Sequence, residues 1–357
     1  MEDTDYTKPI FFILMFFAII LTGFLCKVLS SVFIPVAISI LMALAFYPIV
    51  KNLELKAKIK WPIGSLIVVL IIIITIASLS GILVSSLSTI TSEYPKYETK
   101  LMTIFGFFAD KLNFSFDSEK SFFTNLWNII ELRKYVQNAA IFLSSGIMSF
   151  GKALILILLM FSFLLIEINS FKRRITNAVK KEKKQTVLNI SNQIGEDVVR
   201  FLSIKFFISL ATGILVFLTT LIIGLDFPIV WGFFAFIMNF IPTFGSIISV
   251  ILTTLFSILQ FYPHYGKVIF ILLFMIAINF ILGNIIEPRI EGDRLGLSPF
   301  AILVSLTLWA YLWGFIGMIL AVPMTVIIKI FCENIPYLNF LSTILGNKRK
   351  IKEKSNK

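Results

Sequence analysis

Charged residues are scarce in this chain of 357 residues, because Asp, Glu, Lys and Arg together make up only 15% of it. An average soluble domain contains about 25%. Hydrophobic residues make up 58%, and the mean hydropathy is +0.93. A soluble chain of this length would cover one to three domains with charge, and this chain has too little to do so. The shortage argues against a soluble enzyme, a disordered chain and a secreted disulfide-rich scaffold.

Cysteine and histidine are nearly absent. Cys26 and Cys332 lie in two distant hydrophobic segments, and His264 is the only histidine. Zinc sites, redox pairs and Ser-His-Asp triads need more of these residues at fixed spacings. The glycine-rich stretch 146–153 lacks the Ser or Thr with which a phosphate loop holds Mg²⁺. We therefore expect no enzymatic activity, no metal and no cofactor.

Long apolar runs are abundant instead. Four of them contain no charged residue, and they lie at 10–25, 63–87, 153–166 and 295–328. A helix that crosses a bilayer needs about 20 mostly apolar residues. The runs predict an all-α polytopic membrane protein of about eight transmembrane helices, with broken or re-entrant segments in its C-terminal half. Its first partner is the lipid bilayer.

The predicted elements form a single integral membrane domain over residues 1–357. We divide it into N-terminal helices 1 to 3 at 10–84, an amphipathic helical segment at 85–145, helices 4 to 8 at 146–335, and a basic cytoplasmic tail at 336–357. Within the first part, a basic loop at 51–60 separates helix 2 from helix 3. In the amphipathic segment, apolar residues recur at helical spacing between charges.

Basic residues gather between the apolar runs. Residues 51–60 carry four basic residues against one acidic, 169–200 carry eight against three, and 346–357 carry six against one. Residues 85–145 carry six of each sign. The positive-inside rule therefore predicts a multi-pass protein of the cell (cytoplasmic) membrane with both termini in the cytoplasm. No recognition motif accompanies the net charge of +12, so we expect no nucleic-acid partner.

The C-terminal half contains two uncharged stretches that proline and glycine interrupt. The first, 227–266, is broken at 239–245, and the second runs over 295–328. Irregular backbone is not tolerated against lipid, so such breaks must be buried in protein or must line a water-filled cavity. Paired interruptions of this kind are typical of a transporter's binding site. Ordinary proline kinks and a tight external hairpin are the structural alternative.

Charges next to apolar segments are functional candidates by default. Glu167 ends one predicted helix, Asp226 lies in a turn between two, and residues 287–294 hold five charges. The structural alternatives are an interfacial ion pair for Glu167, a helix cap for Asp226 and a solvated loop for 287–294. Pro288 disfavours helix at Glu287, which predicts that loop. The functional alternative is a charged gate at the mouth of a cavity.

Three motifs in this half resemble the signatures of the AI-2E family of membrane transporters. They are Asn239-Phe-Ile-Pro242-Thr-Phe-Gly245, then 286–292 (IEPRIEG) followed by 295–299 (LGLSP), and finally 317–323 (GMILAVP). Their order and spacing also agree, and the resemblance spans about residues 10–335. The sequence departs from the family pattern at Asn279, Glu291 and Asp293, and the last two make the candidate gate more acidic.

The resemblance implies a multi-pass transporter of a family named for export of the signal autoinducer-2, some members of which exchange Na⁺ or Li⁺ for H⁺. On this basis we expect the substrate-binding or gating residues to be Asn239, Pro242, Gly245, Asn279, Asn284, Glu287, Pro288, Arg289, Gly296 and Pro299. The candidates for ion coupling are Glu167, Asp226 and Glu287.

Three functions are compatible with these observations. The first is a secondary transporter that exports a small polar metabolite or a quorum-sensing signal by alternating access. The second is a Na⁺(Li⁺)/H⁺ antiporter, which needs an acid within the membrane, and no Asp or Glu lies in the middle of a predicted span. The third is a non-transporting membrane scaffold that uses 85–145 to bind partners. Small residues such as Gly314, Gly317 and Ala321 allow close helix packing and are compatible with a homo-oligomer.

Overall fold

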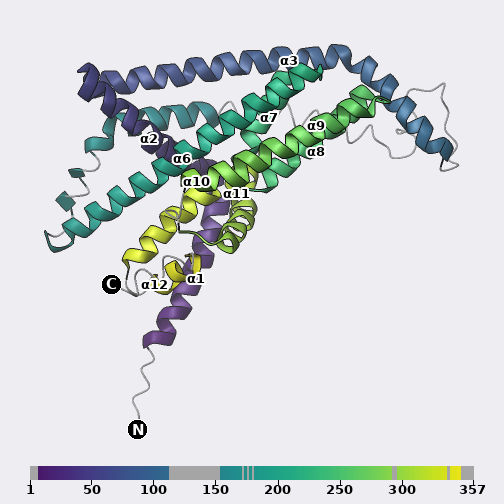
Figure 1. Cartoon of the computed structure of the whole chain (residues 1–357). Helices are drawn as coiled ribbons and strands as arrows, with labels where there is room; N and C mark the ends of the chain where they lie inside the picture. The colour runs from purple at the N-terminus through teal and green to yellow at the C-terminus, as the bar shows by residue number, and fades with distance from the viewer. Residues whose placement is uncertain are drawn as a thin grey trace, which may run out of the picture. The chain divides into compact units, whose positions relative to one another are not determined.

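The computed structural model describes residues 7–111, 153–170, 173–174, 177–178, 181–291, 296–335 and 338–346, and nearly all of them are helical (Figure 1). Among these residues, seven helices are long and apolar enough to cross a membrane: Ser30–Ala57, Trp61–Ile82, Ala153–Ser170, Lys184–Ile223, Phe244–Phe261, Tyr265–Glu291 and Pro299–Asn334. Two shorter apolar helices lie at Ile13–Val28 and Pro228–Met238. The prediction of an all-α polytopic membrane protein is confirmed.

The helices before residue 224 include α1 (Thr7–Val28), α2 (Ser30–Ala57), α3 (Trp61–Lys111) and α6 (Lys181–Ile223). Two of them, α2 and α3, run further than the predicted spans. The expected loop at 51–60 is therefore mostly helical, and α2 ends only where Lys58 adopts a left-handed conformation. A helix that has formed in an apolar span extends at little cost, because each added residue contributes a backbone hydrogen bond.

The helix α3 also continues beyond the predicted end near residue 84. Its 51 residues reach about 77 Å at 1.5 Å per residue, which is more than twice the thickness of the bilayer core. The first part of the amphipathic segment is thus a direct extension of a candidate span. Residues 112–152 lie outside the described residues, and they include the rest of the amphipathic segment, 112–145.

The elements that follow are shorter, except for α11. They are α7 (Pro228–Met238), α8 (Phe244–Phe261), α9 (Tyr265–Asn279), the π-helix η1 (Phe280–Ile286), α10 (Glu287–Glu291), α11 (Pro299–Asn334) and α12 (Asn339–Leu345). The predicted break at 239–245 separates α7 from α8 and is confirmed.

The expected loop at Glu287 is wrong, because α9, η1 and α10 form one continuous helical path through Pro288. In an α-helix, a proline ring clashes with the carbonyl four residues earlier and lacks the N–H of the ladder. The turn before Pro288 is wider: the N–H of Glu287 donates to the carbonyl of Leu282, five residues earlier. This π register shifts the preceding carbonyls and accommodates the proline.

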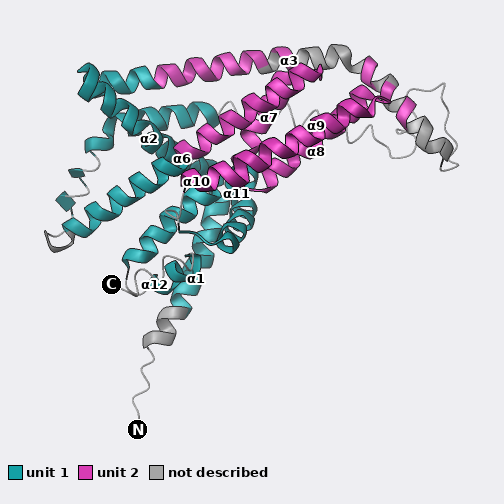
Figure 2. Cartoon of the chain, in the orientation of Figure 1, with its two compact units in different colours: residues 1–68, 152–201, 293–357 teal, residues 69–151, 202–292 magenta. Residues whose placement is uncertain are grey.

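The chain divides into two compact units that are interleaved in sequence (Figure 2). Unit 1 contains residues 1–68, 152–201 and 293–357, and unit 2 contains 69–151 and 202–292. Two of the boundaries fall inside the continuous helices α3 and α6. The single-domain assignment stays a prediction.

Unit 1 is held together by side chains that hydrogen-bond to carbonyls of other helices. The indole of Trp61 donates to the carbonyl of Leu165 at 2.9 Å, and the Ser39 hydroxyl to that of Ile157 at 3.0 Å. In lipid, such bonds and close packing replace the hydrophobic effect between helices. These bonds tie α2 and the start of α3 to the helix Ala153–Ser170.

The long helix α11, also in unit 1, folds back on itself. Gly314 has φ 62° and ψ −140°, which is not helical. The Ser305 hydroxyl donates to the carbonyl of Ala321 at 3.1 Å. On a straight helix these residues would lie about 24 Å apart along the axis. The predicted interruption of 295–328 is therefore present, as a sharp bend between two helical arms.

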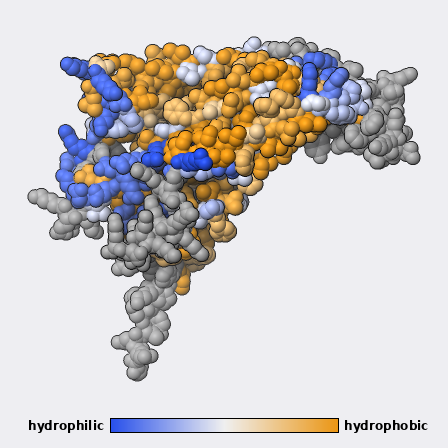
Figure 3. Space-filling model, viewed as in Figure 1, coloured by the Kyte–Doolittle hydropathy of each residue, from blue (hydrophilic) through white to orange (hydrophobic). Residues whose placement is uncertain are grey.

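Unit 2 packs α7, α8 and α9 around a core with α6. Two glycines allow α6 and α7 to approach closely, since a Cβ added at Gly232 would lie 2.8 Å from the Gly213 carbonyl. The fully buried core residues include Val216, Ile271 and Met275. Many other large apolar side chains, such as Ile222, are exposed along the helices, as the broad apolar surface of Figure 3 shows. Such faces suit contact with lipid.

Candidate solute-binding pocket

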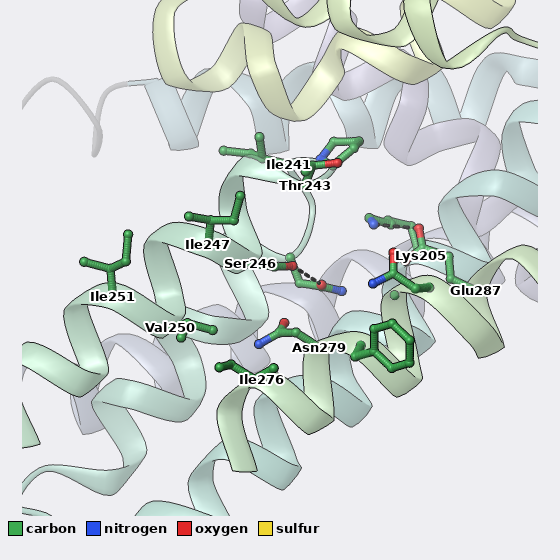
Figure 4. A pocket seen from close by; sticks show the side chains of 15 residues that line it. Lys205, Ile241, Thr243, Ser246, Ile247, Val250, Ile251, Ile276, Asn279 and Glu287 are labelled. Atoms are coloured by element: carbon green, nitrogen blue, oxygen red, sulfur yellow. Dashed lines mark hydrogen bonds and ion pairs between the residues drawn. The ribbon is translucent and has the colours of Figure 1, made fainter. Parts of the chain in front are cut away.

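Unit 2 contains a pocket of about 410 Å³ (Figure 4). This volume is within the range of about 300–1,000 Å³ that is typical of small-molecule sites. The lining comes from α6, the α7–α8 turn, α8, α9, η1 and the start of α10. The polar or charged lining residues are Lys205, Asn239, Thr243, Ser246, Asn279, Asn284 and Glu287. Apolar walls come mainly from Ile241, Ile247, Val250, Ile251, Ile276 and Phe280.

The α7–α8 turn forms one side of the pocket, and Asn239 holds it in place. The Asn239 side chain is 4% exposed; its amide N–H donates to the Ser209 hydroxyl on α6 at 3.0 Å. Its amide oxygen accepts a longer hydrogen bond of 3.5 Å from Ser246 on α8 (Figure 4). One buried amide thus joins three helices, which accounts for an asparagine at a helix end.

The turn itself needs a glycine. Thr243 adopts a positive φ of 65°, and the backbone then folds Gly245 against the end of α7. A Cβ added at Gly245 would lie 1.7 Å from the Met238 carbonyl oxygen, a distance that no real contact allows. Gly245 therefore supports the pocket from behind the turn and is not part of its lining.

Asn279 and Asn284 project amides from the junction of α9 and η1. One N–H of Asn279 donates to the carbonyl of Met275 at 2.8 Å, which leaves its second N–H and its amide oxygen available to the pocket. Asn284 is exposed. Between them Gly283 has open space around its Cα. This side of the pocket thus offers uncharged donors and acceptors to a solute.

A buried ion pair completes the lining. The Lys205 ammonium on α6 lies 2.6 Å from Oε1 of Glu287, and the two side chains are 4% and 15% exposed. Among the described residues, Glu287 is the hydrogen-bond partner of Lys205. An ammonium has three N–H donors, of which the bond to Glu287 uses one, and Lys205 itself lines the pocket.

Residues 10–337 match the family described as "AI-2E family transporter". The chain belongs to the AI-2E transporter family.

Curated relatives agree with this family. The chain is 30% identical over 343 residues to a protein of Borreliella burgdorferi named "Putative transport protein", an alignment that covers 95% of this chain and 91% of the relative. It is 28% identical to a protein of the same name from Haemophilus influenzae, covering 92% and 93%. It is 26% identical to the "AI-2 transport protein TqsA" of Escherichia coli, covering 90% and 91%. Membership of a transporter family is consistent with a protein that is not an enzyme.

The structure places only some of the predicted site residues at the pocket. Five of the ten line it: Asn239, Pro242, Asn279, Asn284 and Glu287. Three of the others lie in unit 2 outside the lining, namely Gly245 behind the turn and the exposed Pro288 and Arg289 on α10. Gly296 and Pro299 belong to unit 1, where Pro299 opens α11 and the Ser298 hydroxyl caps it.

The ion-coupling candidates lie in three different environments. Glu287 lines the pocket, whereas Glu167 is exposed and lies 4.0 Å from Arg174, at the limit of an ion pair. Such a surface pair contributes little to stability. It agrees with the interfacial pair that we expected as the structural alternative for Glu167.

Asp226 does not cap α7, so that structural expectation is wrong: the N-cap residue is Phe227 and has no side-chain cap. The Asp226 carboxylate instead accepts hydrogen bonds from Lys96 at 2.6 Å and Tyr97 at 2.5 Å, both on α3. Burial raises the pKa of Asp226, but these bonds and the charges of Lys96 and Lys100 outweigh it, so the net pKa lies below its ordinary value of 3.8. These contacts fasten α3 to the α6–α7 turn.

Sequence reasoning missed Lys205, although a signal was present. Lys205 is the single charge in the apolar stretch 201–223, and a charge inside a span is a functional candidate. The partner of Lys205 lies 82 residues away, so the ion pair itself could not be read from the sequence.

Proposed function

We propose that this AI-2E family member is a secondary transporter that exports a small polar metabolite, or a quorum-sensing signal of the autoinducer-2 type, across the cytoplasmic membrane by alternating access. The observation that carries the proposal is the pocket of about 410 Å³ in unit 2. Amide and hydroxyl groups converge on it from helices whose other faces are apolar.

The composition of the lining supports a small polar solute. Solute sites in proteins combine apolar walls with a few well-placed polar groups that fix the orientation of the ligand. This pocket follows that pattern, with Ile247 and Phe280 among its apolar residues and Asn279 and Asn284 among its polar ones. The break between α7 and α8 also supports the proposal, because transporters commonly form their solute sites at discontinuous membrane helices.

Release from proteoliposomes tests the proposal. Purified protein is reconstituted into vesicles loaded with the polar metabolite fraction of bacterial cells, and solutes released are identified by mass spectrometry. We expect the wild type to release a defined subset beyond protein-free vesicles. We expect Asn279→Leu to lower that release by about tenfold or more, because it removes hydrogen bonds that a buried polar ligand would need.

Asn334→Leu is the matched control. Asn334 donates to the carbonyl of Ile330 at 2.8 Å, the same local bond that Asn279 makes, but it lies in unit 1 and outside the pocket. Folded wild-type protein that releases nothing beyond protein-free vesicles would refute the proposal. Equal losses in the two asparagine variants would refute the role of the pocket.

A Na⁺(Li⁺)/H⁺ antiporter is the second candidate, and Glu287 is the observation in its favour. A carboxylate in a pocket can exchange a proton for a cation, but here the Lys205 ammonium already occupies its Oε1. A sodium gradient across vesicles that contain a pH-sensitive dye separates the two candidates. Sodium-dependent proton movement that is lost in Glu287→Gln would favour antiport over solute export.

A further inference from the structure

The charges of the residues that line the pocket sum to zero. Lys205 is the positive lining residue and Glu287 the negative one, and they lie 2.6 Å apart. Arg289 and Glu291 lie further along α10 and are not part of the lining. A solute that enters the pocket therefore meets one paired ammonium and carboxylate among uncharged groups.

Because this ion pair is largely buried, it favours some classes of solute over others. Separating a buried ion pair, or bringing a third charge beside it, leaves one charge without a partner in a region of low dielectric constant. A cation at Glu287 would either displace the Lys205 ammonium, which is 4% exposed, or add a third charge beside the intact pair. An anion at Lys205 would either displace the Glu287 carboxylate or likewise add a third charge. In each case one charge is left without a partner.

A polar solute without net charge avoids this cost. Its hydroxyl or carbonyl groups can bind the remaining N–H donors of Lys205 and the second oxygen of Glu287 while the pair stays intact. A zwitterion can also replace the pair, because each protein charge then gains an opposite charge from the solute. In both cases every buried charge keeps a partner.

We infer that Lys205 is a specificity-determining residue of the pocket, and that its pair with Glu287 restricts the pocket to polar solutes that carry no net charge. This inference rests on the proposed transport function. It names a chemical class, namely neutral or zwitterionic polar solutes, and a residue that no motif of the sequence analysis contains.

Changing one member of the pair tests this inference in the vesicle assay described above. Lys205→Gln keeps a donor for Glu287 but leaves the pocket with one negative charge, so the released set should gain singly charged cations. Glu287→Gln keeps an acceptor for Lys205, so the released set should gain singly charged anions. We expect the ratio of charged to neutral solutes to change by about tenfold, which corresponds to about 1.4 kcal/mol.

Glu333→Gln is the matched control, because it removes the carboxylate of another largely buried ion pair, 3.5 Å from Lys329, in unit 1 and outside the lining. It should leave the charge profile of the released solutes unchanged. Asn279→Asp is a second route if Lys205→Gln fails to fold. It adds one negative charge to the pocket with the ion pair intact, so it should also admit cations.

The possible outcomes separate the two proposals. Wild-type release of singly charged solutes as readily as neutral ones would overturn the inference, and so would variants that keep the wild-type charge profile. In both cases the proposed transport function would stand. Folded wild-type protein that releases no solute would overturn the transport function and the inference with it.

Discussion

The α7–α8 turn offers the sharpest test of the structure. Gly245→Ala adds one methyl group that would lie 1.7 Å from the carbonyl oxygen of Met238 and 2.6 Å from its carbonyl carbon. Both atoms belong to the backbone, so no side chain can rotate away to make room. Either α7 or α8 must move by more than an ångström, which would pull Asn239 away from Ser209.

The expected loss of stability is large for a single methyl group. Overpacking a tightly packed site costs about 1–3 kcal/mol, and the backbone position of this clash places it at about 3 kcal/mol. At about 2–4 °C per kcal/mol, the unfolding midpoint should fall by roughly 6–12 °C. Thermal unfolding of the purified protein in detergent, followed by tryptophan fluorescence, measures this change.

Gly266→Ala is the matched control for this experiment. Gly266 is the second residue of α9, as Gly245 is of α8, but a Cβ added there would meet no atom within 4 Å. Alanine has the higher helix propensity, so this variant should unfold at the wild-type temperature or slightly above it. If the two variants unfold within about 1 °C of each other, the close approach of α7 and α8 is wrong.

Three further predictions concern other parts of the chain. The pKa of Asp226 is lowered in the folded state. The carboxylate therefore stabilises the fold above its ordinary pKa of 3.8, and this contribution is lost as the pH falls through the pKa of the folded state. In an unfolding titration from pH 7 to 3, Asp226→Asn should lose less stability than the wild type as the pH falls. Glu167→Gln should change the free energy of unfolding by less than about 0.5 kcal/mol, since its ion pair is exposed, and a larger change in the same thermal assay would refute that view. Gly314→Ala should lower stability by about 1–3 kcal/mol, because its φ of 62° with ψ −140° suits glycine alone, whereas Gly81→Ala in open space should not.

Breaks in the helices were the part of the fold that the sequence predicted best. The break at 239–245 and the bend at Gly314 do interrupt helices, because proline and glycine have local backbone effects, whereas Pro323 lies inside α11. Helix ends without such residues were predicted poorly, since α3 continues beyond the predicted end of its span near residue 84. Polar residues can occupy a helix that an adjoining apolar span has already nucleated.

The residues of the candidate site also fall into two groups, those that the sequence could identify and those that it could not. Asn239, Asn279 and Glu287 could be selected from the sequence because they are polar residues in or beside apolar runs. Lys205 and the α3 contacts of Asp226 depend on residues 82 and 130 positions apart, which only the packing of helices brings together. The helix through Pro288 depends on a π register that leaves no clear pattern in seven residues.

The interleaving of the two units has a consequence for how the protein is made. In unit 1, the indole of Trp313 donates to the carbonyl of Cys26 across 287 residues, and α11 packs against α1 and α2. Because α1 and α2 leave the ribosome before α11, they stay in the membrane without this partner until α11 has been inserted. The helices that line the pocket, from α6 to α10, are contiguous along the chain and can assemble earlier. Translation thus completes the pocket before α11, and loss of residues 298–357 would remove a partner of α1 and α2 rather than the pocket.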